Sequence, residues 1–255
     1  MEGFKFIFWE AMKALSLALV ALLASKAAGT LGAAAAPSAA RSRLRLALYA
    51  AILALCGLGA RAIGKDLAAR FYYWASQDDL ARSDVPRAYA NALRAVELRP
   101  GTLGYWRALA RSKFSQQQFQ SMLEDRPAFE ALSHGSLEEE DALRFAFADF
   151  FLAQYDRVIP VTAALIRENR FYAEPYVLQG SAYAAEGKYA EAERSFLDVL
   201  QMFPSQEDAV RGLAAVYFVS GKRAKALAVL GETEKFPFAP AARQRFRDLV
   251  TLYSQ

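Results

Sequence analysis

Cysteine and histidine are almost absent from this chain of 255 residues, which contains only Cys56 and His134. One cysteine cannot build a disulfide framework or a cysteine-rich zinc site. The histidine lies in a Ser-His-Gly-Ser stretch without the partners that a catalytic triad needs. The acidic run 138–141 fits the start of a helix, where the macrodipole favours carboxylates, better than a metal site. We therefore expect no enzymatic activity, no catalytic residue, no cofactor and no metal.

Positive charge is scarce outside the first seventy residues. The formal net charge is +4, and residues 1–70 carry nine Lys and Arg against three Asp and Glu, which leaves the remainder slightly acidic. These basic residues flank apolar segments, as at the edges of membrane helices, and the rest of the chain has no basic stripe. We therefore exclude nucleic acid as a partner.

Two apolar stretches, 14–25 and 46–60, dominate the N-terminal region. A spanning helix needs roughly 20 mainly apolar residues, so each stretch must be extended, to 4–25 and to 44–64. We predict that residues 1–64 form a membrane anchor with one or two spans in the lipid bilayer. The alternatives are a cleaved signal peptide for the first stretch and a buried helix or a lipid-anchored Cys56 for the second.

The charges beside these stretches predict an orientation. The linker between them carries Lys26, Arg41, Arg43 and Arg45 and no acidic residue, which places it on the cytoplasmic side. Residues after Lys65 are then outside. Because the Ala- and Arg-rich composition suggests a bacterial source, we expect an inner-membrane protein with its C-terminal region in the periplasm.

The remaining chain, 65–255, is helical in pattern, with apolar residues three and four apart. It contains a clear repeat at 173–204. Counted from Ala173 as position 1, large residues fall at positions 4, 11, 17 and 24, small ones at 8 and 20, and a proline at 32; these are Tyr176, Tyr183, Tyr189, Phe196, Gly180, Ala192 and Pro204. This pattern resembles the tetratricopeptide (TPR) repeat family, most clearly over 173–240. The small residues at positions 8 and 20 are expected to face each other across two antiparallel helices.

The 34-residue TPR period extends the repeat in both directions. A unit starting at Glu207 matches well, whereas one starting at Glu139 has the atypical residues Asp149, Val158 and Thr162, with Pro160 inside its second helix. Further back, Asp84 is a candidate N-cap with Pro86 in the first turn, and the period drifts. We predict an all-α solenoid of four to five TPR-like units over 65–255, closed by a C-terminal capping helix at 241–253.

The resemblance also implies a binding surface. In TPR proteins the first helix of each unit lines a concave groove through positions 2, 5, 9, 12 and 13. The candidate groove residues transferred in this way are mainly apolar and include Phe147, Phe150, Phe151, Val177, Ser181, Arg211 and Phe218. Packing of the three phenylalanines between helices is the competing interpretation, because aromatic residues at helical spacing usually belong to a core.

These observations favour a non-enzymatic, membrane-anchored TPR scaffold that binds a protein partner in a membrane or envelope complex. A second hypothesis is an accessory or regulatory subunit of a membrane enzyme, such as a polysaccharide ligase or polymerase. A third is a secreted TPR adaptor, which requires cleavage near Ala36.

Overall fold

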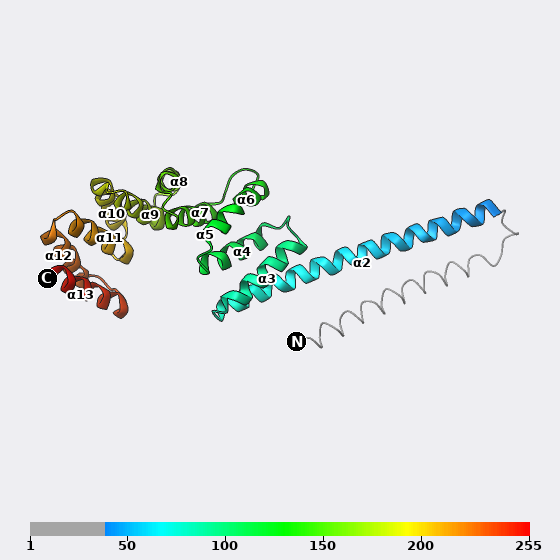
Figure 1. Cartoon of the computed structure of the whole chain (residues 1–255), viewed down its shortest axis with the longest axis horizontal. Helices are drawn as coiled ribbons and strands as arrows, with labels where there is room; N and C mark the ends of the chain where they lie inside the picture. The colour runs from blue at the N-terminus through cyan, green and yellow to red at the C-terminus, as the bar shows by residue number, and fades with distance from the viewer. Residues whose placement is uncertain (1–38) are drawn as a thin grey trace.

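The computed structural model describes residues 39–255, and this part of the chain is entirely helical (Figure 1). The predicted all-α class is confirmed. The helices are α2 (Ala39–Ala81), α3 (Val85–Leu98), α4 (Leu103–Ser115), α5 (Phe119–Glu124), α6 (Arg126–Leu132), α7 (Glu139–Phe151), α8 (Tyr155–Glu168), α9 (Ala173–Ala185), α10 (Tyr189–Met202), α11 (Glu207–Val219), α12 (Arg223–Glu232), a 3₁₀ turn η1 (Thr233–Lys235) and α13 (Pro240–Ser254).

Successive helices pair into hairpins that follow one another in a row from the end of α2 to α13 (Figure 1). The first helices of three units, α7, α9 and α11, begin at Glu139, Ala173 and Glu207, which are the three predicted unit starts. Asp84 caps α3 as predicted, since its carboxylate accepts a hydrogen bond from the Arg87 backbone N–H. The predicted repeat register is therefore correct for the units that start at Glu139, Ala173 and Glu207.

One backbone feature recurs at the turn inside every hairpin. Gly187 and Gly221 have φ of 76° and 75° at position 15 of their units, and three other residues with φ near 60° occupy the corresponding turns: Ser83, Gln117 and Ala153. This left-handed conformation is costly for any residue other than glycine. Within residues 39–255 its recurrence defines five units, of which only the last two keep the glycine that marks the turn in the sequence.

The apparent drift of the period arises in the unit that begins with α4. Its start, Leu103, lies 36 residues before Glu139, whereas Glu139, Ala173 and Glu207 are 34 apart. The second helix of this unit is broken into α5 and α6 just before Pro127, which lacks the N–H for an intrahelical bond to Leu123. By contrast, Pro160 lies inside α8 without interrupting it.

Beside the break, Lys113 of α4 is nearly buried and reaches the connection between α5 and α6. Its Nζ donates to the Ser121 carbonyl at 3.0 Å and lies 2.6 Å from the Asp125 carboxylate. A buried ammonium needs such partners. This contact holds the broken second helix against α4.

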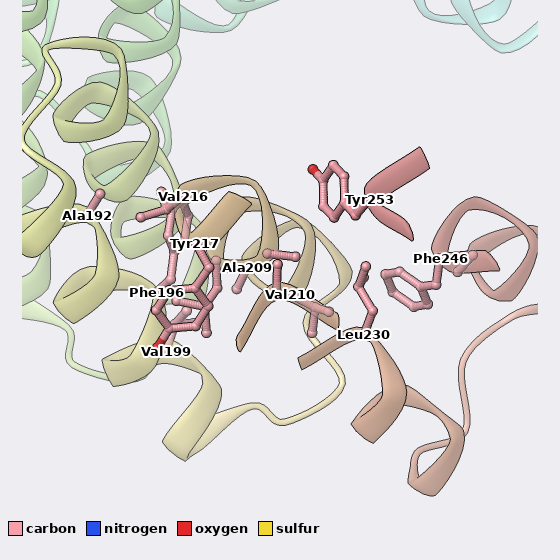
Figure 2. Packing of buried hydrophobic residues seen from close by; sticks show 14 of the residues in the cluster. Ala192, Phe196, Val199, Ala209, Val210, Val216, Tyr217, Leu230, Phe246 and Tyr253 are labelled. Carbon is pink, nitrogen blue, oxygen red and sulfur yellow. The ribbon is translucent and has the colours of Figure 1, made fainter. Parts of the chain in front are cut away.

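The largest core lies at the C-terminal end (Figure 2). Phe196 and Val199 of α10 pack with Val210 and Tyr217 of α11, and Leu230 of α12 joins Phe246 of α13 on the other side. The helix predicted at 241–253 is α13, and its Ala242, Phe246 and Tyr253 are buried. Thus α13 covers the apolar face that the last hairpin would otherwise expose.

The predicted anchor falls at the edge of the described region. Candidate span 4–25 lies outside the described residues, and candidate span 44–64 falls within α2, where several side chains are also outside the description. Over residues 39–255, no helix combines the length and apolar character that crossing a bilayer requires. The membrane anchor therefore stays a prediction.

Candidate protein-binding surface

Five phenylalanines from α4, α5 and α7 form an aromatic cluster: Phe114, Phe119, Phe147, Phe150 and Phe151. The rings of Phe119 and Phe151 stack with centroids 4.6 Å apart, and Phe114 meets Phe147 edge-on at 6.3 Å. Such aromatic pairs contribute about 0.5–1.5 kcal/mol beyond their burial. Yet Phe151 remains 53% exposed. The cluster is thus a packed apolar surface that is open to solvent at Phe151.

Three members of this cluster were predicted from the sequence. Phe147 and Phe150 are half-buried against neighbouring helices, whereas Phe151 is exposed, so packing between helices accounts for the first two better than for the third. The other two, Phe114 and Phe119, were missed because their unit had lost its sequence signature. A signal was present, since Phe114 follows Leu103 by the same eleven residues as Phe150 follows Glu139.

A second apolar area lies at the C-terminal end. Phe218 of α11 stacks on Tyr253 of α13, with ring centroids 4.1 Å apart and planes inclined by 9°. Phe218 keeps part of its surface exposed, and Val219 and Leu252 are also exposed. We call Phe218, Val219 and Leu252 the C-terminal patch.

Helix α9, the first helix of its unit, lies between these two areas and contacts both α7 and α11. Its predicted groove residues are half-buried: Val177 packs against the C-terminal core, and the Ser181 hydroxyl donates to the Val177 carbonyl at 2.8 Å. Ala184 and Ala185 follow at positions 12 and 13, where α7 and α11 carry large apolar residues. Arg211 on α11 is exposed and pairs with Asp208 at 3.3 Å. Small side chains therefore separate the aromatic cluster from the C-terminal patch.

An ion-pair network fixes α4 and α7, the helices that carry Phe114 and Phe147. Arg107 of α4 lies 2.7 Å from the buried carboxylate of Asp141 and 2.7 Å from Glu138. Arg144 binds Asp141 from the other side at 3.1 Å. The hydrogen bonds that Arg107 donates to Asp141 and Glu138 raise the pKa of Arg107, and the hydrogen bond that Arg144 donates to Glu140 lowers the pKa of Glu140. Because a broken buried pair leaves an uncompensated charge, this network holds the two helices in one arrangement.

The described residues offer little for chemistry. Over 39–255, no group of three or more His, Cys, Asp or Glu side chains is arranged to hold a metal ion. His134 is exposed in the turn after α6 with φ of 56°, and three residues of the acidic run, Glu139, Glu140 and Asp141, form the first turn of α7. What this surface can provide is apolar and aromatic contact.

Comparison with known proteins agrees with this architecture. Residues 183–236, from the end of α9 through α12, match the family model described as Tetratricopeptide repeat. The fold is a TPR-like α-solenoid. No curated protein matches this TPR-like chain in sequence.

Solved structures share the solenoid at low identity. The crystal structure of MamA protein is 17% identical with a TM-score of 0.55, over 68% of this chain and 97% of that one. A thermophilic TPR protein of Thermus thermophilus is 19% identical with a TM-score of 0.57, over 72% and 100%. YrrB, described as a TPR protein with an unusual peptide-binding site, is 18% identical with a TM-score of 0.53, over 72% and 91%. At this identity the similarity shows the fold alone.

Proposed function

We propose that this protein is a non-enzymatic scaffold, anchored in a membrane by residues 1–64, that binds a protein partner through the first helices of its units. The observation that carries the proposal is Phe151, a large apolar side chain that stacks on Phe119 and is still 53% exposed. Rigid aromatic side chains of this kind are the usual anchors of protein interfaces. The peptide-binding site described for YrrB supports a peptide segment as the bound element.

The surface fits a segment that presents apolar side chains at two separated points. One point is the aromatic cluster, and the other is the C-terminal patch, with Ala184 and Ala185 between them. Small residues leave room for a bulky side chain of the partner to approach α9. We expect the partner to be part of a membrane or envelope complex, because the apolar stretch at 46–60 leads directly into the solenoid through α2.

The binding proposal is tested with full-length tagged protein purified from membranes with its partners. Phe151→Ser should reduce partner recovery by about tenfold, which corresponds to loss of one anchor worth about 1.4 kcal/mol. The matched control is Phe171→Ser, which alters another exposed phenylalanine, in the turn between α8 and α9. Equal recovery with both variants would refute binding at Phe151.

The anchoring proposal needs separate measurements. The full-length protein should stay in the membrane fraction after carbonate or high-salt washing, because apolar insertion is not weakened by salt screening. A periplasm-dependent reporter fused after Gln255 should be active, consistent with an inner-membrane protein whose solenoid is periplasmic. Recovery of the full-length chain in the soluble fraction would refute the anchor, and activity only of a cytoplasmic reporter would reverse the orientation.

A further inference from the structure

The part of α2 that carries the solenoid has two opposite faces, of which one is buried and the other is exposed and apolar. One face buries Ala69 and Ser76 against α3 and α4. The other exposes Ile63, Leu67 and Trp74, at 56%, 42% and 68%. Since successive residues of an α-helix are rotated by about 100°, Leu67 and Trp74 point nearly opposite to Ala69 and Ser76. The second face is therefore not part of the solenoid core.

The spacing along this second face is regular. Cys56, Ala60, Ile63, Leu67 and Trp74, which we call the α2 seam, are separated by four, three, four and seven residues. Alternating steps of three and four place residues on the line along which two helices pack lengthwise. Cys56 and Ala60 are exposed like the others, so the seam continues over about 27 Å of helix at 1.5 Å per residue.

The seam cannot turn towards the solenoid, because contacts with α3 fix the rotation of α2 about its own axis. Arg99 at the end of α3 donates to the Ala62 carbonyl at 3.1 Å and lies 3.5 Å from the Asp66 carboxylate. These contacts join α2 to α3 beside Ile63. The orientation of the exposed face is thus set by the same packing that forms the first unit.

Charge on the seam is locally balanced. Arg70 occupies the seam position between Leu67 and Trp74, and its guanidinium lies 3.0 Å from the Asp66 carboxylate of the same helix. Arg61 and Lys65 are exposed on α2 but are rotated away from the seam. Two such seams can therefore meet with each Arg70 paired inside its own chain, to the Asp66 carboxylate that Arg99 also approaches.

We propose that the α2 seam packs against the α2 seam of a second copy of this chain, with the two helices parallel. The parallel direction rests on the proposed anchor, since two copies inserted in one membrane point the same way. In a symmetric pair the seam of each copy is covered by the seam of the other copy, as in most homo-oligomers. The bilayer cannot cover all of it: a straight α2 that spans the membrane over 44–64 carries Trp74 about 15 Å beyond the span.

The single cysteine of the chain permits a direct test in native membranes. In a parallel pair, Cys56 faces Cys56 of the second copy, so oxidation with copper phenanthroline should give a disulfide-linked product of twice the chain mass. Ile63→Cys in a Cys56→Ser background should give the same product. The matched control, Leu58→Cys in that background, places an exposed cysteine on α2 away from the seam and should give little. Two differently tagged copies should both appear in the product.

Disruption of the seam outside the predicted span completes the experiment. Leu67→Ser with Trp74→Ser should lower the Cys56 product by about tenfold or more, because apolar burial drives the contact. Thermal melting should show that the solenoid is still folded, with no more than the small loss expected from the Tyr73–Trp74 ring pair. No product at Cys56 and Ile63→Cys, equal yields at Leu58→Cys, or a product with another protein would overturn the proposal. A dimer recovered in the soluble fraction would refute the anchor and the parallel direction of the two helices, but it would still support pairing through the α2 seam.

Discussion

The ring of Phe196 lies so close to Gly212 that a methyl group on that glycine would come within 2.4 Å of the ring. The same ring would meet a methyl group on Gly180 at 2.9 Å. Phe196 is 1% exposed and joins α10 to the first helices of two successive units, α9 and α11 (Figure 2). One aromatic side chain therefore sets the spacing both within a hairpin and between hairpins.

This contact predicts a large effect from a very small substitution. Gly212→Ala should lower the free energy of unfolding by about 1–3 kcal/mol, the usual cost of overpacking, and Gly180→Ala should act in the same direction. Both are measured by thermal melting of the full-length protein in detergent. Gly231→Ala is the matched control, because its added methyl group meets no atom within 4 Å.

Replacing the Phe196 ring with a smaller side chain provides a second check on the same contact. By itself, Phe196→Leu should lower the free energy of unfolding. In the double variant with Gly212→Ala, the measured loss should be smaller than the sum of the two single losses, since the smaller side chain makes room for the methyl group. Strict additivity would contradict the proposed clash.

Ala153 offers a prediction of opposite sign. Its φ of 59° places it in the left-handed region at the same turn where later units have Gly187 and Gly221. Ala153→Gly should therefore raise the free energy of unfolding by about 0.5–1 kcal/mol, because relief of the backbone cost exceeds the added chain entropy of glycine. Ala146→Gly, in the middle of α7, is the control and should destabilise. A loss of stability in Ala153→Gly would show that this turn is not strained.

These contacts mark the limits of prediction from sequence. Unit starts at Glu139, Ala173 and Glu207 followed from spacing, because helix length and turn length are set locally. Gly180, at position 8 of its unit, was expected to face Ala192 at position 20. The nearest side chain to Gly180 is instead Phe196, one turn further along α10. Gly212 was not singled out because its constraint comes from a different unit. Phe114 and Phe119 were likewise missed, since their packing against Phe147 and Phe151 depends on how neighbouring hairpins stack.

Phe218 was predicted as a groove residue, and a side chain that only lines a groove can be removed with little loss of stability. Its stacking on Tyr253 instead predicts that Phe218→Ala loosens α13, at a cost of about 0.5–1.5 kcal/mol from the lost aromatic pair. Because units of a solenoid contact only their neighbours, the loss should stay local. Hydrogen exchange should therefore accelerate in α13 and α12 but not in α3 or α4. Uniform acceleration would argue against a locally docked cap.

Asp149 of α7 is a buried carboxylate whose negative charge is only weakly compensated by its surroundings. Its side chain is 1% exposed, and neither oxygen has a hydrogen-bond partner within the described chain. The guanidinium nitrogens of Arg126 and Arg157 lie 4.0 Å and 3.9 Å away, too far for hydrogen bonds. Burial raises the pKa of Asp149 above its ordinary value in spite of these two cations. Folding therefore costs more free energy when Asp149 is ionised than when it is protonated, so the ionised carboxylate lowers the stability of the folded protein.

We therefore predict that Asp149→Asn is at least as stable as the parent chain at pH 7. An acid whose pKa is raised by folding stabilises the protein below its unfolded pKa of about 3.9 and loses that contribution as pH rises through the folded value. The melting-temperature advantage of Asn should accordingly shrink as pH falls from 7 towards 4. Because Arg126 and Arg157 both reach solvent, loss of the carboxylate leaves no buried cation behind. Asp198→Asn on the exposed face of α10 is the control and should show no such trend. An Asn variant that is less stable at pH 7 than at pH 4, relative to the parent, would mean that the two arginines outweigh burial and that Asp149 is a stabilising ion-pair partner.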